Sequence, residues 1–163
     1  MKRNHKNYLK LAFSAAEINL GKTDLNPSVG CVVVKNDTVI AIGSTSKKGR
    51  PHAEFNALNK KINYQGSTLY VTMEPCTHYG KTPPCSKLII KSKIKEVIFS
   101  IVDIDKRTAS KSFKIFKRHN IKVKSGILKK EGQQFYKSYI YNKIKKLPFV
   151  TCKLAASKDG FIY

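Results

Sequence analysis

The chain has 163 residues, of which 41% are hydrophobic and 10% aromatic, so it is long enough to bury the core of one domain. No run of about 18 consecutive hydrophobic residues is present, and this excludes a transmembrane helix. The 32 Lys and Arg residues outnumber the 10 Asp and Glu residues, and the net charge of +22 favours anionic partners over cationic ones.

The first half of the chain alternates helical and strand-like patterns. Hydrophobic residues recur at helical spacing over 7–21, which predicts a first helix. Residues 28–44 contain two β-branched runs around Lys-Asn-Asp at 35–37, and this pattern predicts a hairpin because Asn and Asp tolerate a tight turn. Helical periodicity returns over 52–61, and 67–73 is typical of a strand.

The second half continues the same alternation of helices and strands. Strands that alternate with helices predict an α/β fold, here a three-layer α/β/α sandwich. The central sheet should be mixed and flanked by helices, because the hairpin contributes an antiparallel pair. The expected elements are helices over 85–93, 110–120 and 129–146 and strands over 96–102, 121–128 and 147–157.

The N-terminal segment is basic, but it lacks the small-residue cleavage site of a secretory signal. We therefore expect a cytoplasmic, reducing environment, in which two close cysteines are more often catalytic or metal-binding than disulfide-bonded. Cys31 and Cys152 lie in hydrophobic strand-like segments, so we expect both to be buried and outside any site. His5 and His119 are flanked by basic and polar residues and are expected at the surface.

The excess of positive charge has two interpretations. Such a field attracts nucleic acids and phosphorylated small molecules. Most of the basic residues are scattered lysines, however, and compositional drift would give the same totals. The sequence contains no aromatic–basic RNA-binding motif. We therefore expect drift combined with a phosphate-bearing substrate, and not a nucleic-acid partner.

Two cysteines separated by eight residues lie in the stretch EPCTHYGKTPPC at 74–85. A disulfide, a metal site or an accidental pairing could explain them. With His52 upstream, Cys76 and Cys85 complete three protein ligands, the number that a catalytic zinc has beside its open position. Cys85 follows Pro84 at an expected helix start, where unpaired backbone amides favour the thiolate. We therefore expect one zinc ion per chain.

Glu54 follows His52 by two residues and is the candidate catalytic residue. At a helix start this spacing turns the carboxylate away from the ligand direction but keeps it near a water molecule on the metal. Zinc lowers the pKa of that water toward neutrality, and a carboxylate can pass its proton to a departing amine. A His-x-Glu motif followed by Pro-Cys and a second Cys is typical of zinc deaminases, although their cysteines usually have two intervening residues. The pattern favours hydrolytic deamination.

Three other interpretations stay open at this point. A structural zinc would need a fourth protein ligand, which His78 could supply. A zinc deaminase acting on another nucleoside, nucleotide or tRNA base would use the same three ligands. A non-catalytic zinc-binding protein is also compatible with the ligands, but it would have no need of the Glu54 carboxylate.

The stretches NPSVGCVVVK, HAEFNAL and LYVTMEPCTHYGKTPPC closely resemble the deaminase domain of the bacterial riboflavin-biosynthesis deaminase/reductase, a member of the cytidine deaminase-like superfamily. Members of this family have the long insert between the two cysteines. The resemblance implies the cytidine deaminase-like fold, with a zinc-dependent deaminase domain over 1–146. It also implies the deamination of 2,5-diamino-6-ribosylamino-4(3H)-pyrimidinone 5′-phosphate to 5-amino-6-(5-phosphoribosylamino)uracil, with release of ammonia.

The same resemblance implies four substrate-binding residues. Asn26 should contact the ring, and His78 and Lys81 in the insert should contact the substrate and its phosphate. Asp103 is the fourth residue carried over. A lysine is suited to this role because its ammonium group is a point charge that pairs with phosphate.

Two positions depart from the family pattern. Thr45 stands where the family usually has a histidine, and Asp105 stands where it has an asparagine. A carboxylate at position 105 could repel a substrate phosphate or accept a different hydrogen bond.

The segment 147–163 resembles the opening strand of the reductase domain of that family. A complete reductase domain is longer than this segment. We therefore expect that these residues do not perform the reduction alone, whether they form a stand-alone deaminase or a fragment, and a separate reductase chain is one candidate partner. We also expect a homo-oligomer and no membrane partner.

Overall fold

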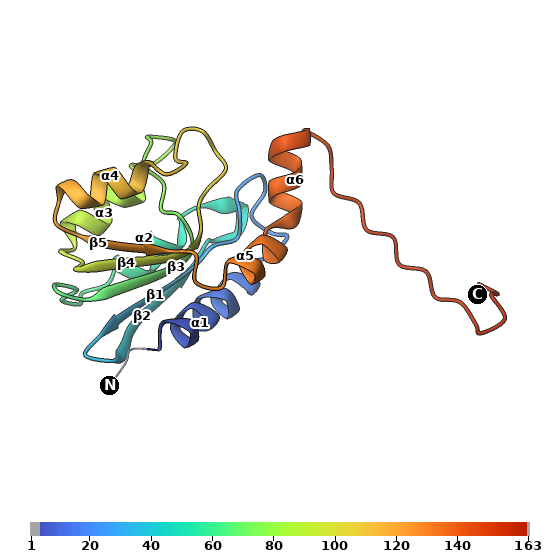
Figure 1. The fold of residues 1–163 in the computed structure, drawn as a ribbon, viewed down its shortest axis with the longest axis horizontal. Coiled ribbons are helices and arrows are strands. Elements are labelled where there is room, and N and C mark those ends of the chain that lie inside the picture. The colour runs from blue at the N-terminus through green and yellow to red at the C-terminus, as the bar shows by residue number, and fades with distance from the viewer. Residues whose placement is uncertain (1–3, 163) are drawn as a thin grey trace.

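The structure is a computed structural model that describes residues 4–162. Within these residues, five strands form one sheet with the order β2-β1-β3-β4-β5 (Figure 1). The strands are β1 Gly30–Lys35, β2 Thr38–Ser44, β3 Thr68–Met73, β4 Glu96–Ile101 and β5 Lys122–Ser125. The helices are α1 His5–Glu17, α2 Ala53–Leu58, α3 Cys85–Lys91, α4 Lys111–Arg118, α5 Lys129–Phe135 and α6 Lys137–Lys145, with a short 3-10 helix, η1, at Lys47–Gly49.

The sheet is mixed, as predicted. Strand β1 runs antiparallel to both β2 and β3, whereas β3, β4 and β5 are parallel to one another. Asn36 and Asp37 connect β1 and β2 with φ values of 50° and 58°, the left-handed conformation that a two-residue hairpin turn of type I′ requires. The predicted hairpin over 28–44 is therefore confirmed.

Alternating side chains along the strands form a hydrophobic core on each face of the sheet. Helices α2, α3 and α4 cover one face, and α1 covers the other (Figure 1). Because successive strand residues point to opposite faces, neighbours in sequence belong to different cores. The first core includes Cys31, Val33, Leu69, Val71, Val97 and Phe99, and the second includes Val32, Val34, Tyr70 and Ile98. This arrangement confirms the three-layer α/β/α sandwich.

Gly43 in β2 allows α2 to pack closely against the sheet. A Cβ atom at this position would overlap the backbone of Ala53 and Ala57 in α2. Any larger residue would therefore push the helix outward. Since His52 and Glu54 lie at the start of α2, this contact determines how far both side chains reach toward the centre of the molecule.

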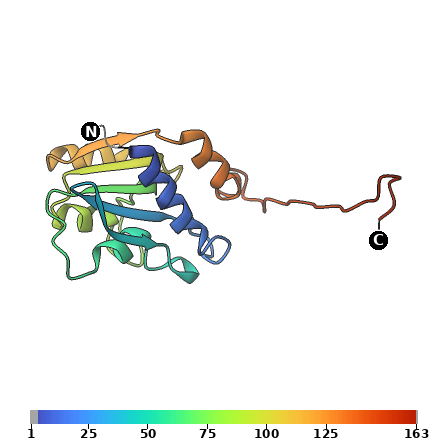
Figure 2. The ribbon, with the colours of Figure 1, turned by 90° about the horizontal axis from the view of Figure 1, so that it is seen from below.

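The C-terminal segment differs from the prediction. Among the described residues, 147–157 form no strand, and the chain beyond α6 runs away from the sheet as an exposed, extended segment (Figures 1 and 2). A strand needs a neighbouring strand to pair its backbone N–H and C=O groups, and none lies beside this segment. Cys152 is exposed here, so the prediction that it is buried is wrong, whereas Cys31 is buried as predicted.

Three further details refine the prediction. The helix expected over 129–146 is divided into α5 and α6 at the buried residue Tyr136. His119 is exposed, but His5 is half-buried, and its Nδ1 lies 2.9 Å from the hydroxyl of Tyr70. In the described part of the chain, no helix combines the length and hydrophobicity that crossing a membrane requires.

Candidate active site

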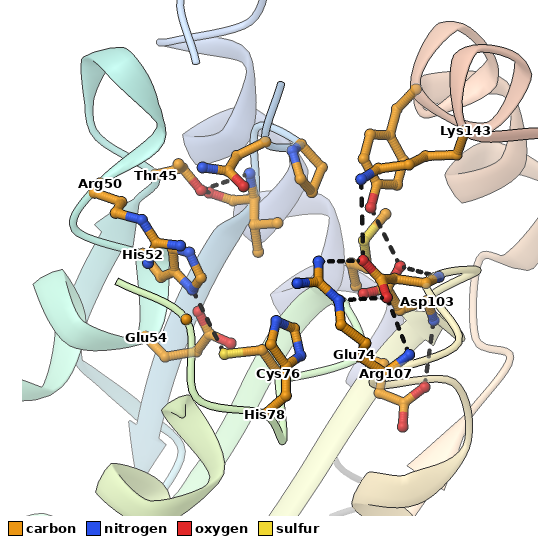
Figure 3. Close-up of a pocket in the computed structure, with 17 residues that line it drawn as sticks. Thr45, Arg50, His52, Glu54, Glu74, Cys76, His78, Asp103, Arg107 and Lys143 are labelled. Atoms are coloured by element: carbon orange, nitrogen blue, oxygen red, sulfur yellow. Dashed lines mark hydrogen bonds and ion pairs between the residues drawn. The ribbon is translucent and has the colours of Figure 1, made fainter. Parts of the chain in front are cut away.

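Three potential metal ligands converge where α2 and α3 begin. His52 directly precedes α2, Cys85 is the first residue of α3, and Cys76 lies in the loop after β3. The Nδ1 atom of His52 is 3.6 Å from Sγ of Cys76 and 3.4 Å from Sγ of Cys85 (Figure 3 shows the first two residues). A nitrogen and a sulfur at their usual distances from a tetrahedral zinc ion lie about 3.6 Å apart. The three side chains therefore fit a single zinc ion.

His78 is not part of this ligand group. Its Nδ1 atom lies 3.1 Å from Oγ1 of Thr108. Across residues 4–162, the group of ligand atoms that lie within 4.8 Å of one another contains only His52, Cys76 and Cys85. A structural zinc with His78 as fourth ligand is therefore not supported, and three protein ligands leave a coordination position for a reactant.

The favoured thiolate of this cluster is Cys76 and not Cys85. Hydrogen bonds from the Cys85 thiol and from His52 lower the pKa of Cys76, whereas the same bond to Cys76 and burial raise the pKa of Cys85. The backbone amide at the start of α3 acts as predicted, but it donates to the other sulfur: Cys85 N lies 3.2 Å from Cys76 Sγ. The helix start therefore also supports an anionic sulfur at Cys76, and the thiolate expected at Cys85 as a metal ligand stays a prediction.

Glu54 lies beside His52 and Cys76 and is only 4% exposed (Figure 3). Burial, and then the nearby Cys76 sulfur, raise the pKa of the Glu54 carboxyl group to about 7. A carboxyl group with this pKa can both accept and release a proton near neutral pH. The environment of Glu54 is therefore suited to proton transfer.

A pocket opens in front of these residues. The cavity measures about 120 Å³ and continues into open solvent. Of the predicted substrate-binding residues, Asn26, His78 and Asp103 line it, whereas Lys81 is exposed on the insert and lies outside the lining. The contacts of all four residues with a substrate stay predictions. The structure thus brings together three of the four, from three separate loops.

Asn26 is held by the loop that carries η1. Its Nδ2 atom donates to the backbone oxygen of Gly49 at 3.2 Å, and Thr23 Oγ1 donates to the Asn26 carbonyl at 2.7 Å. No described residue donates to its side-chain oxygen, which leaves this acceptor available to a ligand in the pocket.

Thr45, the first departure from the family pattern, is buried at the wall of the pocket. Its Oγ1 atom accepts a hydrogen bond from the backbone N–H of Val29 at 3.0 Å. Asn19 Nδ2 donates to the Thr45 carbonyl at 2.8 Å. Thr45 therefore joins the end of β2 to the segment that precedes β1.

Asp105, the second departure, has its charge neutralised by two cations. Arg107 Nε lies 2.9 Å from Oδ1 and Arg107 Nη2 lies 2.6 Å from Oδ2, and Lys143 Nζ lies 3.9 Å from Oδ2 (Figure 3). Arg107 holds the pKa of Asp105 well below its usual range. The repulsion of a phosphate considered from the sequence is therefore weakened by this pairing.

Asp103 occupies the same wall as Asp105. Its Oδ1 atom accepts from the backbone N–H of Asp105 at 3.0 Å and from the hydroxyl of Tyr139 at 3.3 Å. Burial raises the pKa of the Asp103 carboxyl group. The carboxylate is thus oriented by one donor from its own loop and one from α6.

Glu74 organises this wall, and the sequence analysis did not identify it. The carboxylate is 4% exposed and accepts backbone N–H bonds from Asp103 at 3.3 Å, Ser110 at 3.0 Å and Ser112 at 3.1 Å. It therefore holds the loop between β4 and α4. One sequence signal could have pointed to Glu74, which is a charged residue directly after the hydrophobic strand β3. A carboxylate buried at such a position requires hydrogen-bond donors around it, so it is expected to hold neighbouring segments together.

Tyr136 anchors the remaining part of the wall. Its buried hydroxyl lies 2.5 Å from Oγ1 of Thr72 and donates to the Ser28 carbonyl at 2.9 Å. These bonds attach the junction of α5 and α6 to the sheet, and α6 carries Tyr139 and Lys143 into the pocket. The contacts join residues 64 and 108 positions apart, so no local sequence signal could have revealed them.

Comparison with known proteins places this geometry in a family. Residues 2–101 match the family described as the cytidine and deoxycytidylate deaminase zinc-binding region. The chain is 42% identical over 135 residues to a diaminohydroxyphosphoribosylamino-pyrimidine deaminase of Buchnera aphidicola, a match that covers 81% of this chain and 90% of the relative. It is 40% identical over 154 residues to riboflavin biosynthesis protein RibD of Bacillus amyloliquefaciens. The chain belongs to the RibD deaminase family.

Members of the RibD family differ in length. The chain covers 42% of the Bacillus RibD, although 94% of the chain is matched. The solved structure of the Thermotoga maritima deaminase/reductase superposes with a TM-score of 0.89 at 38% identity, over 95% of this chain and 45% of that one. The chain thus spans less than half the length of these two RibD relatives. The agreement over nearly all of the chain confirms the predicted cytidine deaminase-like fold.

Proposed function

We propose that the chain catalyses the zinc-dependent hydrolytic deamination of 2,5-diamino-6-ribosylamino-4(3H)-pyrimidinone 5′-phosphate in riboflavin biosynthesis. The observation that carries this proposal is the cluster of His52, Cys76 and Cys85 beside buried Glu54, with His52, Cys76 and Glu54 lining a pocket. The substrate is supported by the Buchnera relative, which is named for this deamination and is matched over 90% of its length.

The mechanism assigns one role to each side chain. His52, Cys76 and Cys85 would hold zinc, which supplies Lewis acidity and lowers the pKa of a water molecule toward neutrality. Glu54 accepts the proton of the attacking water and delivers it to the departing amine, because its pKa of about 7 suits both transfers. The burial of Glu54 keeps bulk water away from this proton.

The walls of the pocket would orient the ring and the ribose. Asn26 presents a free side-chain oxygen that can accept from a ring amino group, and Asp103 can accept from a ribose hydroxyl or a second ring donor. His78 lines the pocket from the insert between the cysteines. Lys81 would approach the phosphate from outside as a mobile point charge.

The wider assignments belong to the same proposal. We propose one zinc ion per chain, a deaminase domain over 1–146, and a segment over 147–163 that corresponds to the opening of a reductase domain. The solved Thermotoga relative is named as both deaminase and reductase, which supports a reductase, in a separate chain or a further domain, as the partner that consumes the product. We further propose a cytoplasmic homo-oligomer.

A zinc-replete assay of ammonia release tests the proposal. The phosphorylated pyrimidinone should be deaminated, whereas cytidine, deoxycytidylate and adenosine in RNA should not. Turnover of cytidine, deoxycytidylate or RNA without turnover of the pyrimidinone would instead support a deaminase for another base. Bound zinc without turnover of any substrate would support the non-catalytic alternative.

A further inference from the structure

Arg50 lies at the edge of the pocket, two residues before the zinc ligand His52. The side chain is half-buried, and Nη1 donates to Oγ1 of Thr82 at 2.7 Å. A Cβ atom on Gly80 would lie 3.2 Å from Nη2, so the guanidinium group also lies close to Gly80 in the insert. Arg50 therefore sits between the start of α2 and the turn at 80–82, and lines the pocket from there (Figure 3).

The cations on the other side of the pocket are already paired. Arg107 binds Asp105 through two hydrogen bonds, and Lys143 lies within ion-pair distance of the same carboxylate. Asp103 and Glu74 place two further carboxylates on this side (Figure 3). That wall therefore carries at least as many acidic as basic groups, and an anion gains little there.

Arg50 has no such partner. Within residues 4–162, no carboxylate lies at ion-pair distance from its guanidinium group, and the only hydrogen bond that it forms is the one to Thr82. A guanidinium group has five N–H donors, so four stay available. The bond to Thr82 also holds the side chain in place, which reduces the entropy lost when a ligand binds.

We propose that Arg50 is the principal phosphate-binding residue of the pocket, an assignment that rests on the proposed function because the phosphate belongs to that substrate. The planar fork of arginine pairs with two phosphate oxygens at once, which a lysine cannot do. Its half-buried position also weakens solvent screening relative to exposed Lys81. The ring then lies at Glu54, and the phosphate lies beneath the turn at 80–82.

The first test compares substrates with and without the phosphate. Arg50→Gln keeps a donor for Thr82 but removes the charge, so KM for the phosphorylated pyrimidinone should rise about 10- to 100-fold. KM for its dephosphorylated counterpart should change less than about twofold. For the phosphorylated substrate, the KM of Arg50→Lys should lie between those of the wild type and Arg50→Gln. Zinc content should stay unchanged. Arg118→Gln, which removes a guanidinium group at the end of α4, is the matched control and should behave like the wild type.

A second test does not depend on turnover. Ribose 5-phosphate should bind to the wild type and to Arg118→Gln, as followed by NMR titration, and should lose at least tenfold in affinity in Arg50→Gln. If the wild type binds ribose 5-phosphate through Arg50 but does not deaminate the pyrimidinone, the proposed substrate fails and the phosphate site stands. If the wild type deaminates it and Arg50→Gln raises KM equally for both substrates, the phosphate site is wrong. Loss of ribose 5-phosphate binding in Arg107→Gln but not in Arg50→Gln would likewise overturn it.

Discussion

The two sides of the pocket are built in different ways. The metal side takes its groups from two short segments, 52–54 at the start of α2 and 76–85 between β3 and the start of α3, and these segments form recognisable motifs. The opposite side collects Asp103, Asp105, Arg107 and Lys143 from a loop and from α6, and two buried residues, Glu74 and Tyr136, hold them there.

The difference suits two separate tasks, since one side carries the groups proposed for the reaction and the other carries the groups proposed to select the substrate. Ligand geometry and proton transfer need atoms at fixed distances, and a helix start with adjacent prolines supplies them over a few residues. The opposite wall has only to present charges and donors to a substrate, so it can be assembled from distant parts and can vary. Both departures from the family pattern, Thr45 and Asp105, line the pocket, and neither belongs to the ligand group.

The metal side should be the most sensitive to a single change. Glu54→Gln should lower kcat about 10²- to 10⁴-fold, because the amide cannot accept and release the proton. Zinc content should match the wild type, since Glu54 is not a ligand. Zinc quantification beside the ammonia assay checks both, and full activity in the variant would remove Glu54 from proton transfer.

The opposite wall should respond to the loss of its internal support. Glu74→Gln leaves one oxygen to accept three backbone N–H bonds and turns an NH₂ group toward at least one of them, which should cost about 1–3 kcal/mol of unfolding free energy. KM should rise while zinc content stays constant. Denaturant unfolding and steady-state kinetics measure the two effects.

Exposed Glu131 in α5 offers a control for Glu74, because Glu131→Gln makes the same chemical change without a buried donor set. A loss of zinc in Glu74→Gln would contradict the separation of the two sides, since it would mean that the loop after β4 also supports the ligands.

A smaller effect is expected at the insert. Lys81→Ala should raise KM for the phosphorylated substrate about fivefold or less, because an exposed charge is screened by solvent. Zinc content should not change. Kinetics at low and high salt would show whether the effect is electrostatic, and an unchanged KM at low salt would remove Lys81 from phosphate binding.

The smallest effect should come from Asp105. Asp105→Asn releases Arg107 and Lys143 from their shared carboxylate, so an anionic substrate should bind about two- to threefold more tightly. An increase of tenfold or more would show that the opposite wall, and not Arg50, is the main phosphate site. Measurement of KM in the single variant and in combination with Arg50→Gln distinguishes these outcomes.

Asp105 also predicts a dependence of stability on pH. Because Arg107 lowers its folded-state pKa, the ionised carboxylate stabilises the fold above its unfolded pKa of about 3.9. This contribution is lost as the pH falls through the lower folded-state value. The melting temperature should therefore fall less steeply toward pH 2 in Asp105→Asn than in the wild type. Thermal unfolding measured between pH 2 and 7 checks this.

Local sequence was enough to predict most of the fold and the metal side of the site. The period of two in the strands, the Asn-Asp turn and the helical spacing of 7–21 depend on nearby residues, so the layers, the hairpin and α1 were predicted. The same is true of the group formed by His52 and the two cysteines, which their spacing in short motifs indicated.

Only the tertiary structure decided which groups complete the pocket. Arg50, Glu74 and Tyr136 gain their roles from partners that are tens of residues away, and an arginine or glutamate alone does not indicate whether it is paired or buried. The hydrophobic pattern over 147–157 likewise predicts a strand, but a strand forms only where another strand can pair with its backbone. Hydrogen bonds and ion pairs between distant segments depend on the packing of the whole chain, and the order of residues within one segment does not record that packing.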